Sequence, residues 1–147
     1  MDRRAFLATA LASSLAPMAR AETGRSRLLY VVCPGIRDYL EFGGAGILVY
    51  DIDHGHKLVK RIETPASRDE KPDNIKGVCA CAATKKLYFT TLTKLYCLDL
   101  VTEKTLWEKK LPGGCDRMAI TPDGKTLYVP SFEKDTWNVV AACTWAG

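Results

Sequence analysis

The chain is poor in the residues and motifs that mark common catalytic sites. Only two of its 147 residues are histidines, His54 and His56. It contains no GxSxG nucleophile elbow, no HExxH zinc motif, no P-loop and no GxGxxG dinucleotide fingerprint. These absences remove the usual sequence signatures of serine hydrolases, zinc proteases and nucleotide-dependent enzymes. The sequence therefore assigns no catalytic residue and leaves open whether the protein is an enzyme.

Excess charge and long apolar runs are also lacking. The 21 basic and 17 acidic residues give a net charge of +4. Residues 1–21 hold three arginines and one aspartate, so the remainder carries 18 basic and 16 acidic residues and a net charge of +2. A nucleic-acid-binding domain would show a clustered basic surface, so we expect no nucleic-acid partner. No run of 18 apolar residues follows residue 21, and we expect no stable membrane span there.

The first 21 residues have the layout of an export signal. Its parts are paired charges at Arg3 and Arg4, an apolar run to Ala16, and small residues at Ala19 and Ala21. The string Arg-Arg-Ala-Phe-Leu at 3–7 resembles the twin-arginine signal, which a receptor reads. We expect a signal-peptide helix, cleavage before Glu22, and a bacterial periplasmic or secreted location. An ordinary secretory signal or an amphipathic helix is the alternative.

Six cysteines follow this segment: Cys33, Cys79, Cys81, Cys97, Cys115 and Cys143. Four of them lie in apolar, strand-like runs, where cysteine behaves as a small buried hydrophobic residue. No CxxC pair occurs, which argues against a structural zinc site. We expect packed free thiols and no metal or cofactor. Export leaves a disulfide as the alternative.

An internal repeat of about 40 residues organises the rest of the chain. Tyr88 and Tyr128 each lie in an aromatic strand that follows a polar turn. The next strand also recurs, because 47–52 matches 95–100, with Asp51 and Asp99 at equivalent positions before a turn. Four short β runs per repeat at this period are typical of a β-propeller blade. A β-sandwich with chance similarity is the alternative.

Residues 120–129, Ile-Thr-Pro-Asp-Gly-Lys-Thr-Leu-Tyr-Val, resemble the repeat of YVTN-type β-propeller proteins, close to the quinoprotein and amine-dehydrogenase-like propellers. The resemblance covers about residues 27–140 and implies the N-terminal portion of such a propeller. The second repeat departs from the family pattern, since Ala83-Thr84-Lys85 stands in place of Pro-Asp-Gly. The motif is specific for the fold and implies little about function.

The predicted fold is all-β, an incomplete β-propeller over residues 22–147. We expect blade 1 at about 27–65, blade 2 at about 75–112 and a partial blade 3 at about 115–147. A closed propeller needs at least about four blades, and about two and a half are present here. We interpret the chain as truncated or, alternatively, as a short protein that completes its ring by oligomerising. We expect self-association through uncovered strand faces that carry Leu29, Val31, Leu127 and Val129.

Long loops gather at one end of the predicted blades, and binding sites commonly lie on such loops. The ligand-binding candidates are Arg37, Asp38, Tyr39, Glu41, Arg68, Asp69, Asp116 and Arg117, and the same loops carry Asp73, Lys76, Glu133 and Asp135. His54 and His56 lie in a turn at the opposite end, which argues against a metal role. We predict a scaffold that binds an unidentified ligand or protein. The alternative is the N-terminal part of a quinoprotein-like dehydrogenase or lactonase-type propeller enzyme.

Overall fold

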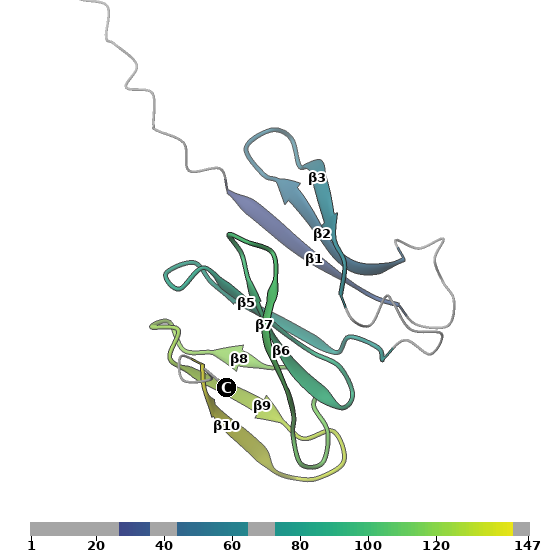
Figure 1. Ribbon diagram of the computed structural model, residues 1–147, viewed down its shortest axis with the longest axis vertical. Coiled ribbons are helices and arrows are strands. Elements are labelled where there is room, and N and C mark those ends of the chain that lie inside the picture. Colours follow the sequence, from purple (N-terminus) through teal and green to yellow (C-terminus); the bar gives the residue numbers. More distant parts are fainter. Residues whose placement is uncertain (1–26, 36–43, 65–72, 143–147) are drawn as a thin grey trace, which may run out of the picture.

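The computed structural model describes residues 27–35, 44–64 and 73–142 (Figure 1). These residues form ten β-strands and no helix. Within this part of the chain there is no helix whose length and apolarity would let it cross a bilayer. The predicted signal peptide and Cys143 lie outside the described residues.

The strands form three antiparallel sheets, each with its strands in chain order. Blade 1 consists of β1 (Leu28–Pro34), β2 (Ala45–Asp51) and β3 (Lys57–Ile62). Blade 2 consists of β4 (Gly77–Cys81), β5 (Lys86–Thr90), β6 (Lys94–Asp99) and β7 (Thr105–Lys110). Blade 3 consists of β8 (Ala119–Ile120), β9 (Thr126–Pro130) and β10 (Trp137–Ala141). The predicted all-β fold and its division into successive up-and-down sheets are confirmed.

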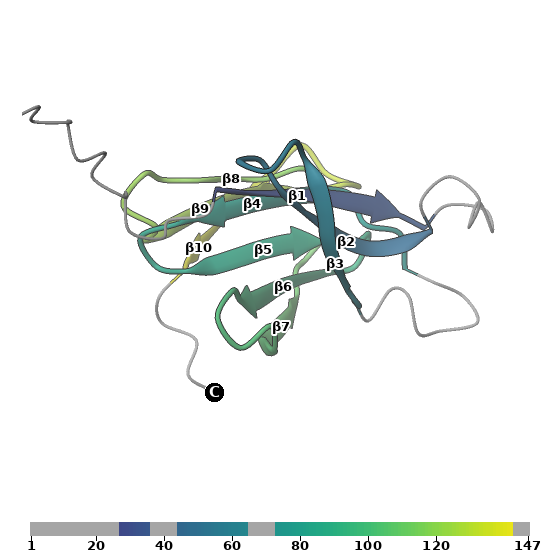
Figure 2. The same cartoon turned by 90° about the horizontal axis from the view of Figure 1, so that it is seen from above.

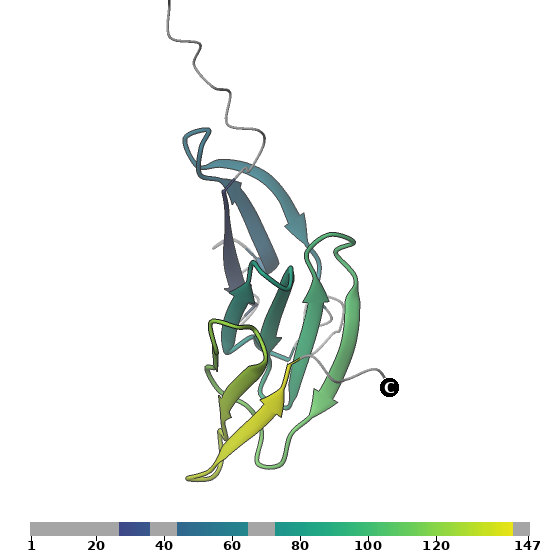
Figure 3. The same cartoon turned by 90° about the vertical axis from the view of Figure 1, so that its left-hand side faces the viewer.

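The three sheets stack face to face with blade 2 in the middle (Figure 3). Figure 2 shows β1, β4 and β8 along one edge of the stack, whereas β7 lies at the opposite edge of blade 2. The place of blade 2 between the other two sheets explains its burial pattern. In β5 and β6 successive residues are buried on both faces of the sheet, because a neighbouring sheet covers each face.

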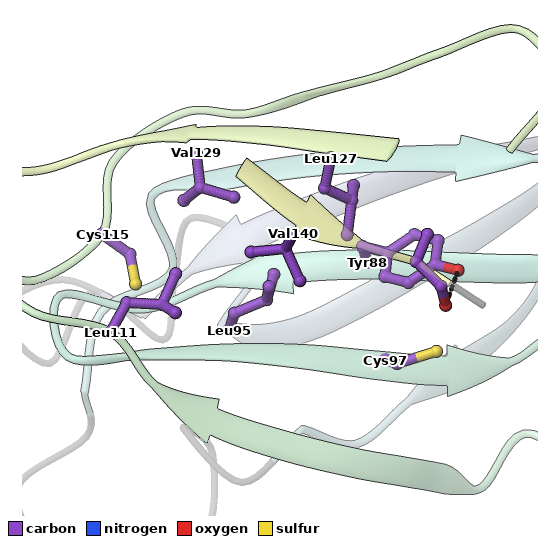
Figure 4. Close-up of a cluster of buried hydrophobic side chains, with 9 residues drawn as sticks. Tyr88, Leu95, Cys97, Leu111, Cys115, Leu127, Val129 and Val140 are labelled. Carbon is purple, nitrogen blue, oxygen red and sulfur yellow. Dashed lines mark hydrogen bonds between the residues drawn. The ribbon is translucent and has the colours of Figure 1, made fainter. Parts of the chain in front are cut away.

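Two apolar clusters hold the stack together. The first lies between blades 1 and 2 and comprises Ile47, Val49, Ile62, Ile75, Leu87, Phe89, Tyr96 and Leu98. The second lies between blades 2 and 3 and comprises Tyr88, Leu95, Cys97, Leu111, Cys115, Leu127, Val129, Val140 and Ala142 (Figure 4). Alternate residues of β5 therefore point into different clusters, as the period of two along a strand requires.

Two of the four residues expected on uncovered faces are buried instead. Leu127 and Val129 have no exposed surface and pack against blade 2. Tyr128, the residue between them, lies on the open face of blade 3, because side chains alternate along β9 and a shift of one residue reverses the face. The expectation holds for blade 1, where Leu29 and Val31 are 41% and 39% exposed.

The sequence repeat extends to the turns that follow β2 and β6. An Asp51 carboxylate oxygen accepts hydrogen bonds from the backbone amides of Asp53 and His54, at 2.9 and 3.2 Å. An Asp99 carboxylate oxygen does the same for Val101 and Thr102, at 2.8 and 2.7 Å. Each aspartate thus caps its own turn, which explains why this residue type recurs at the position.

The five cysteines within the described residues are free, and four of them are buried. The prediction of packed thiols is therefore confirmed for Cys33, Cys79, Cys81, Cys97 and Cys115. Burial raises the pKa of both Cys97 and Cys115 to about 11.

Candidate functional site

The described loops into and within blades 2 and 3 meet at one end of the stack through hydrogen bonds. The amide of Leu92, between β5 and β6, donates to the Asp73 carboxylate at 3.2 Å. The amide of Cys115 donates to the carbonyl of Leu92 at 3.0 Å, and Phe132 donates to Gly113 at 3.1 Å. Each loop is therefore attached to the next, so that the described loops form a continuous surface, which we call the loop face.

The structure places only some of the predicted binding residues. Asp116 and Arg117 lie on the loop face, as do Asp73, Lys76, Glu133 and Asp135. The other six ligand-binding candidates lie outside the described residues: Arg37, Asp38, Tyr39, Glu41, Arg68 and Asp69.

An open pocket of about 480 Å³ lies at the edge formed by the first strands. Its lining comes from all three blades: Val32, Pro34, Ile75, Lys76, Gly77, Val78, Arg117 and Met118. The walls are mainly apolar, and the only charged groups among these described lining residues are the two cations. An apolar pocket with a few convergent polar groups is the usual form of a ligand site.

The backbone before Arg117 is held from both neighbouring blades. The Thr90 hydroxyl of β5 donates to the carbonyl of Asp116 at 2.7 Å. The amide of Asp116 donates to the carbonyl of Pro130 of β9 at 3.0 Å. A Cβ atom on Gly77 would lie 2.7 Å from the Arg117 Cα, so glycine permits this close approach. The Arg117 backbone is thus fixed at the pocket, where its side chain is exposed.

The two cations of the pocket differ in their surroundings. Lys76 Nζ lies 5.4 Å from the centroid of the Phe132 ring, a cation–π contact that links the loop into blade 2 with the β9–β10 loop of blade 3. Arg117 makes no side-chain hydrogen bond or ion pair with any residue in the described part of the chain. Its guanidinium can therefore offer paired donors to a carboxylate or phosphate group.

Two acidic residues of the loop face, Asp73 and Glu133, do not line this pocket. Asp73 has a structural role, since its carboxylate also accepts from the Thr93 hydroxyl at 2.7 Å. Glu133 lines a second open pocket of about 530 Å³, together with Lys110 and the loop 111–114. This second pocket contains charges of both signs, so it has less preference for an anion than the pocket at Arg117.

Sequence reasoning found Lys76 and Arg117 but missed the apolar walls between them. Val32, Ile75 and Met118 come from segments far apart in the chain and meet only after the blades stack. One signal was present, because Lys76 and Arg117 each stand just before the first strand of a blade, at nearly the repeat distance. Equivalent positions in neighbouring blades come close at the same end of the stack.

His54 and His56 lie in the exposed turn between β2 and β3. His54 Nδ1 is 2.8 Å from an Asp51 carboxylate oxygen, and this carboxylate also caps the turn. The described residues contain no group of three histidine, cysteine, aspartate or glutamate side chains that could hold a metal ion.

A scan against protein-family models finds no match, and a search of curated proteins finds none either. Among solved structures, the chain is similar to the β-propeller domain of Myceliophteria thermophila Cps50 (Swd1), with a TM-score of 0.53 and 13% identity over 67% of this chain. It is also similar to KlHsv2 with loop 6CD replaced by a Gly-Ser linker, with a TM-score of 0.53 and 14% identity over 80% of this chain. The matches cover only 30% and 32% of those chains. The described part of the chain therefore has the fold of a partial β-propeller.

Proposed function

We propose that this protein is an exported β-propeller scaffold that binds an acidic segment of a protein partner, or another anionic ligand, at the loop face. The observation that carries the proposal is the pocket at Arg117. It combines apolar walls with two cations and is formed by residues of three blades.

The pocket favours a ligand that carries a carboxylate beside apolar groups. The Arg117 side chain has no acidic partner among the described residues, and a bidentate carboxylate would satisfy its paired donors. Val32, Ile75 and Met118 would contact the apolar part of the ligand. An acidic residue flanked by leucine or isoleucine in a peptide has this combination of groups.

A peptide array tests this proposal. The probes are short peptides with one central aspartate or glutamate flanked by leucine or isoleucine, next to matched peptides with asparagine or glutamine. We expect the acidic peptides to bind and Arg117→Glu to weaken the best binder about tenfold or more, since hydrogen bonds to charged groups are lost.

Lys110→Glu is the matched control, because it makes the same change of charge in the second pocket of the loop face. We expect it to leave binding within about twofold of wild type, because an exposed charge at a distance is screened. Equal loss with Lys110→Glu, or equal binding of the amide peptides, would contradict the proposed site.

Export is the second part of the proposal, and its support is the sequence at the N-terminus. Arg3 and Arg4 precede an apolar run and the small residues Ala19 and Ala21. Residues 1–30 fused to a folded fluorescent reporter should direct it to the bacterial periplasm. Replacement of both arginines by lysine should retain the reporter in the cytoplasm, and unchanged export would contradict a twin-arginine route.

The assignment to the YVTN-type subgroup of propellers is proposed on the motif at 120–129 alone.

A further inference from the structure

The described stack of blades ends in two uncovered apolar sheet faces. On blade 3, Tyr128 of β9 is 42% exposed, and Trp137 and Val139 of β10 are each 65% exposed. On blade 1, Leu29 and Val31 of β1 are exposed on the side that faces away from blade 2. Leu58 of β3 extends this second surface, since it pairs with Tyr50, which pairs in turn with Leu29.

The internal repeat identifies what kind of surface covers each face. We use "exit face" for the side of a blade that meets the next blade, and "entry face" for the side that meets the preceding one. Tyr88 lies opposite Cys97 in blade 2, and both belong to the cluster shared with blade 3. In blade 3 the same register places Tyr128 opposite Val139. Tyr128 and Val139 therefore belong to an exit face with no blade on it in the described structure.

The uncovered side of blade 1 is the complementary type of surface. The entry face of blade 2 carries Leu87, Phe89, Tyr96 and Leu98, which pack on blade 1. The repeat aligns Leu29 with Leu87 and Val31 with Phe89, since Tyr30 pairs with Val49 as Tyr88 pairs with Cys97. Leu29 and Val31 therefore belong to an entry face.

The described part of the chain thus presents one open exit face and one open entry face, and the same two kinds of face already pack on each other twice within the stack. We propose that a second copy of this chain docks head to tail, with the entry face of its blade 1 on the exit face of blade 3. The contact would continue the stacking between blades 2 and 3 across two molecules.

Two further observations favour a second copy as the occupant. Uncovered apolar surfaces of this kind mark interaction sites in folded proteins, and the exposed side chains here include a tryptophan and a tyrosine, which are enriched at interfaces. The described blades also correspond to only 30% and 32% of the two similar propeller structures, so further blades fit beside them in a ring of that type. Such a contact is heterologous, and it closes into a ring or extends as a filament according to its rotation.

Mixing of two blocked variants tests this arrangement on the full chain. Val139→Glu blocks the exit face and leaves the entry face intact, whereas Val31→Glu does the reverse. By sedimentation velocity, wild type should show concentration-dependent species above the monomer, and each variant alone should be monomeric. A one-to-one mixture of the two variants should form a heterodimer and no larger species, because only one pair of intact faces remains.

Val101→Glu is the control, because Val101 is 67% exposed in the turn after β6 and belongs to neither face. It should assemble as wild type does, and circular dichroism of every variant checks the fold.

Tyr128→Lys and Leu29→Lys form a second pair of blocked variants if a glutamate variant unfolds. A monomeric wild type, association of either blocked variant alone, or equal loss with Val101→Glu overturns the proposal. Arg117→Glu lies outside both faces and should assemble normally, so failure of the pocket and failure of the assembly are distinguishable.

Discussion

The hydroxyl of Tyr88 in the middle of blade 2 donates a hydrogen bond to the backbone carbonyl of Ala142, just after the last strand of blade 3, at 3.3 Å (Figure 4). Both residues are fully buried. The ring of Tyr88 also belongs to the apolar cluster between the two blades. A single side chain therefore provides both apolar packing and a polar contact across this interface, which holds the end of blade 3 against blade 2.

Removal of the hydroxyl should weaken the interface measurably. We expect Tyr88→Phe to lower the free energy of unfolding by about 1 kcal/mol, since the buried carbonyl of Ala142 loses a donor. Urea unfolding followed by circular dichroism measures the difference. Tyr128→Phe is the matched control, because Tyr128 is partly exposed and should change stability by less than about 0.5 kcal/mol. Equal effects of the two substitutions would show that the Ala142 contact is not the cause.

Gly114 should tolerate no side chain. It has a φ of +74°, and a Cβ atom there would lie 2.6 Å from the carbonyl oxygen of Leu92. We expect Gly114→Ala to destabilise the protein by more than about 1 kcal/mol, through backbone strain together with this clash. Gly55→Ala isolates the strain, since Gly55 has a φ of +69° and nothing within 4 Å of the added atom. Thermal unfolding should rank Gly114→Ala as the less stable variant, and the reverse order would contradict the close approach.

Stability should decrease in acid through the aspartates that cap turns. Backbone hydrogen bonds from Thr102 and Val101 hold the pKa of Asp99 below its ordinary value of 3.8. The unfolded chain therefore takes up the proton first, and the stabilisation present above about pH 4 is lost as the pH falls through the lower folded pKa. Asp99→Asn should make the melting temperature less dependent on pH below 4 than in wild type.

Asp135→Asn is the control for this pH dependence. Asp135 is exposed and its carboxylate accepts no hydrogen bond from the residues that the structure describes. Its replacement should leave the slope of melting temperature against pH as in wild type. A slope that flattens equally in both variants would assign the effect to net charge rather than to the turn.

The buried thiols should differ in reactivity. Burial raises the pKa of Cys97 and Cys115 to about 11, so little thiolate is present at pH 8. Hydrogen bonds from Thr84 lower the pKa of Cys81. In a short iodoacetamide pulse read by peptide mass spectrometry, Cys81 should react faster than Cys97 or Cys115. Thr84→Val should slow its reaction, whereas all three should react alike after unfolding in urea. Faster labelling of Cys97 in the folded protein would contradict this order.

Much of the fold could be predicted from the sequence because its signals are local. The alternation of apolar residues and the turn residues between strands locate the strands to within a few residues. Asp51 and Asp99 recur at one position because each accepts hydrogen bonds from the two amides that follow in its own turn. Tyr88 and Tyr128 are separated by one repeat, which relates the blades to each other before any contact between them is known.

Only the tertiary structure decided which sides of the outer blades are covered. Leu127, Tyr128 and Val129 are all apolar or aromatic, so their alternation does not distinguish the inner face of β9 from the outer one. The stacking on blade 2 makes the choice, burying Leu127 and Val129 and leaving Tyr128 exposed. The pocket at Arg117 has the same origin, because Val32 and Met118 are distant in the chain and become neighbours through the packing of three sheets. Strands and turns follow from local hydrogen bonding and residue period, whereas burial and pockets depend on which surfaces the sheets turn toward each other.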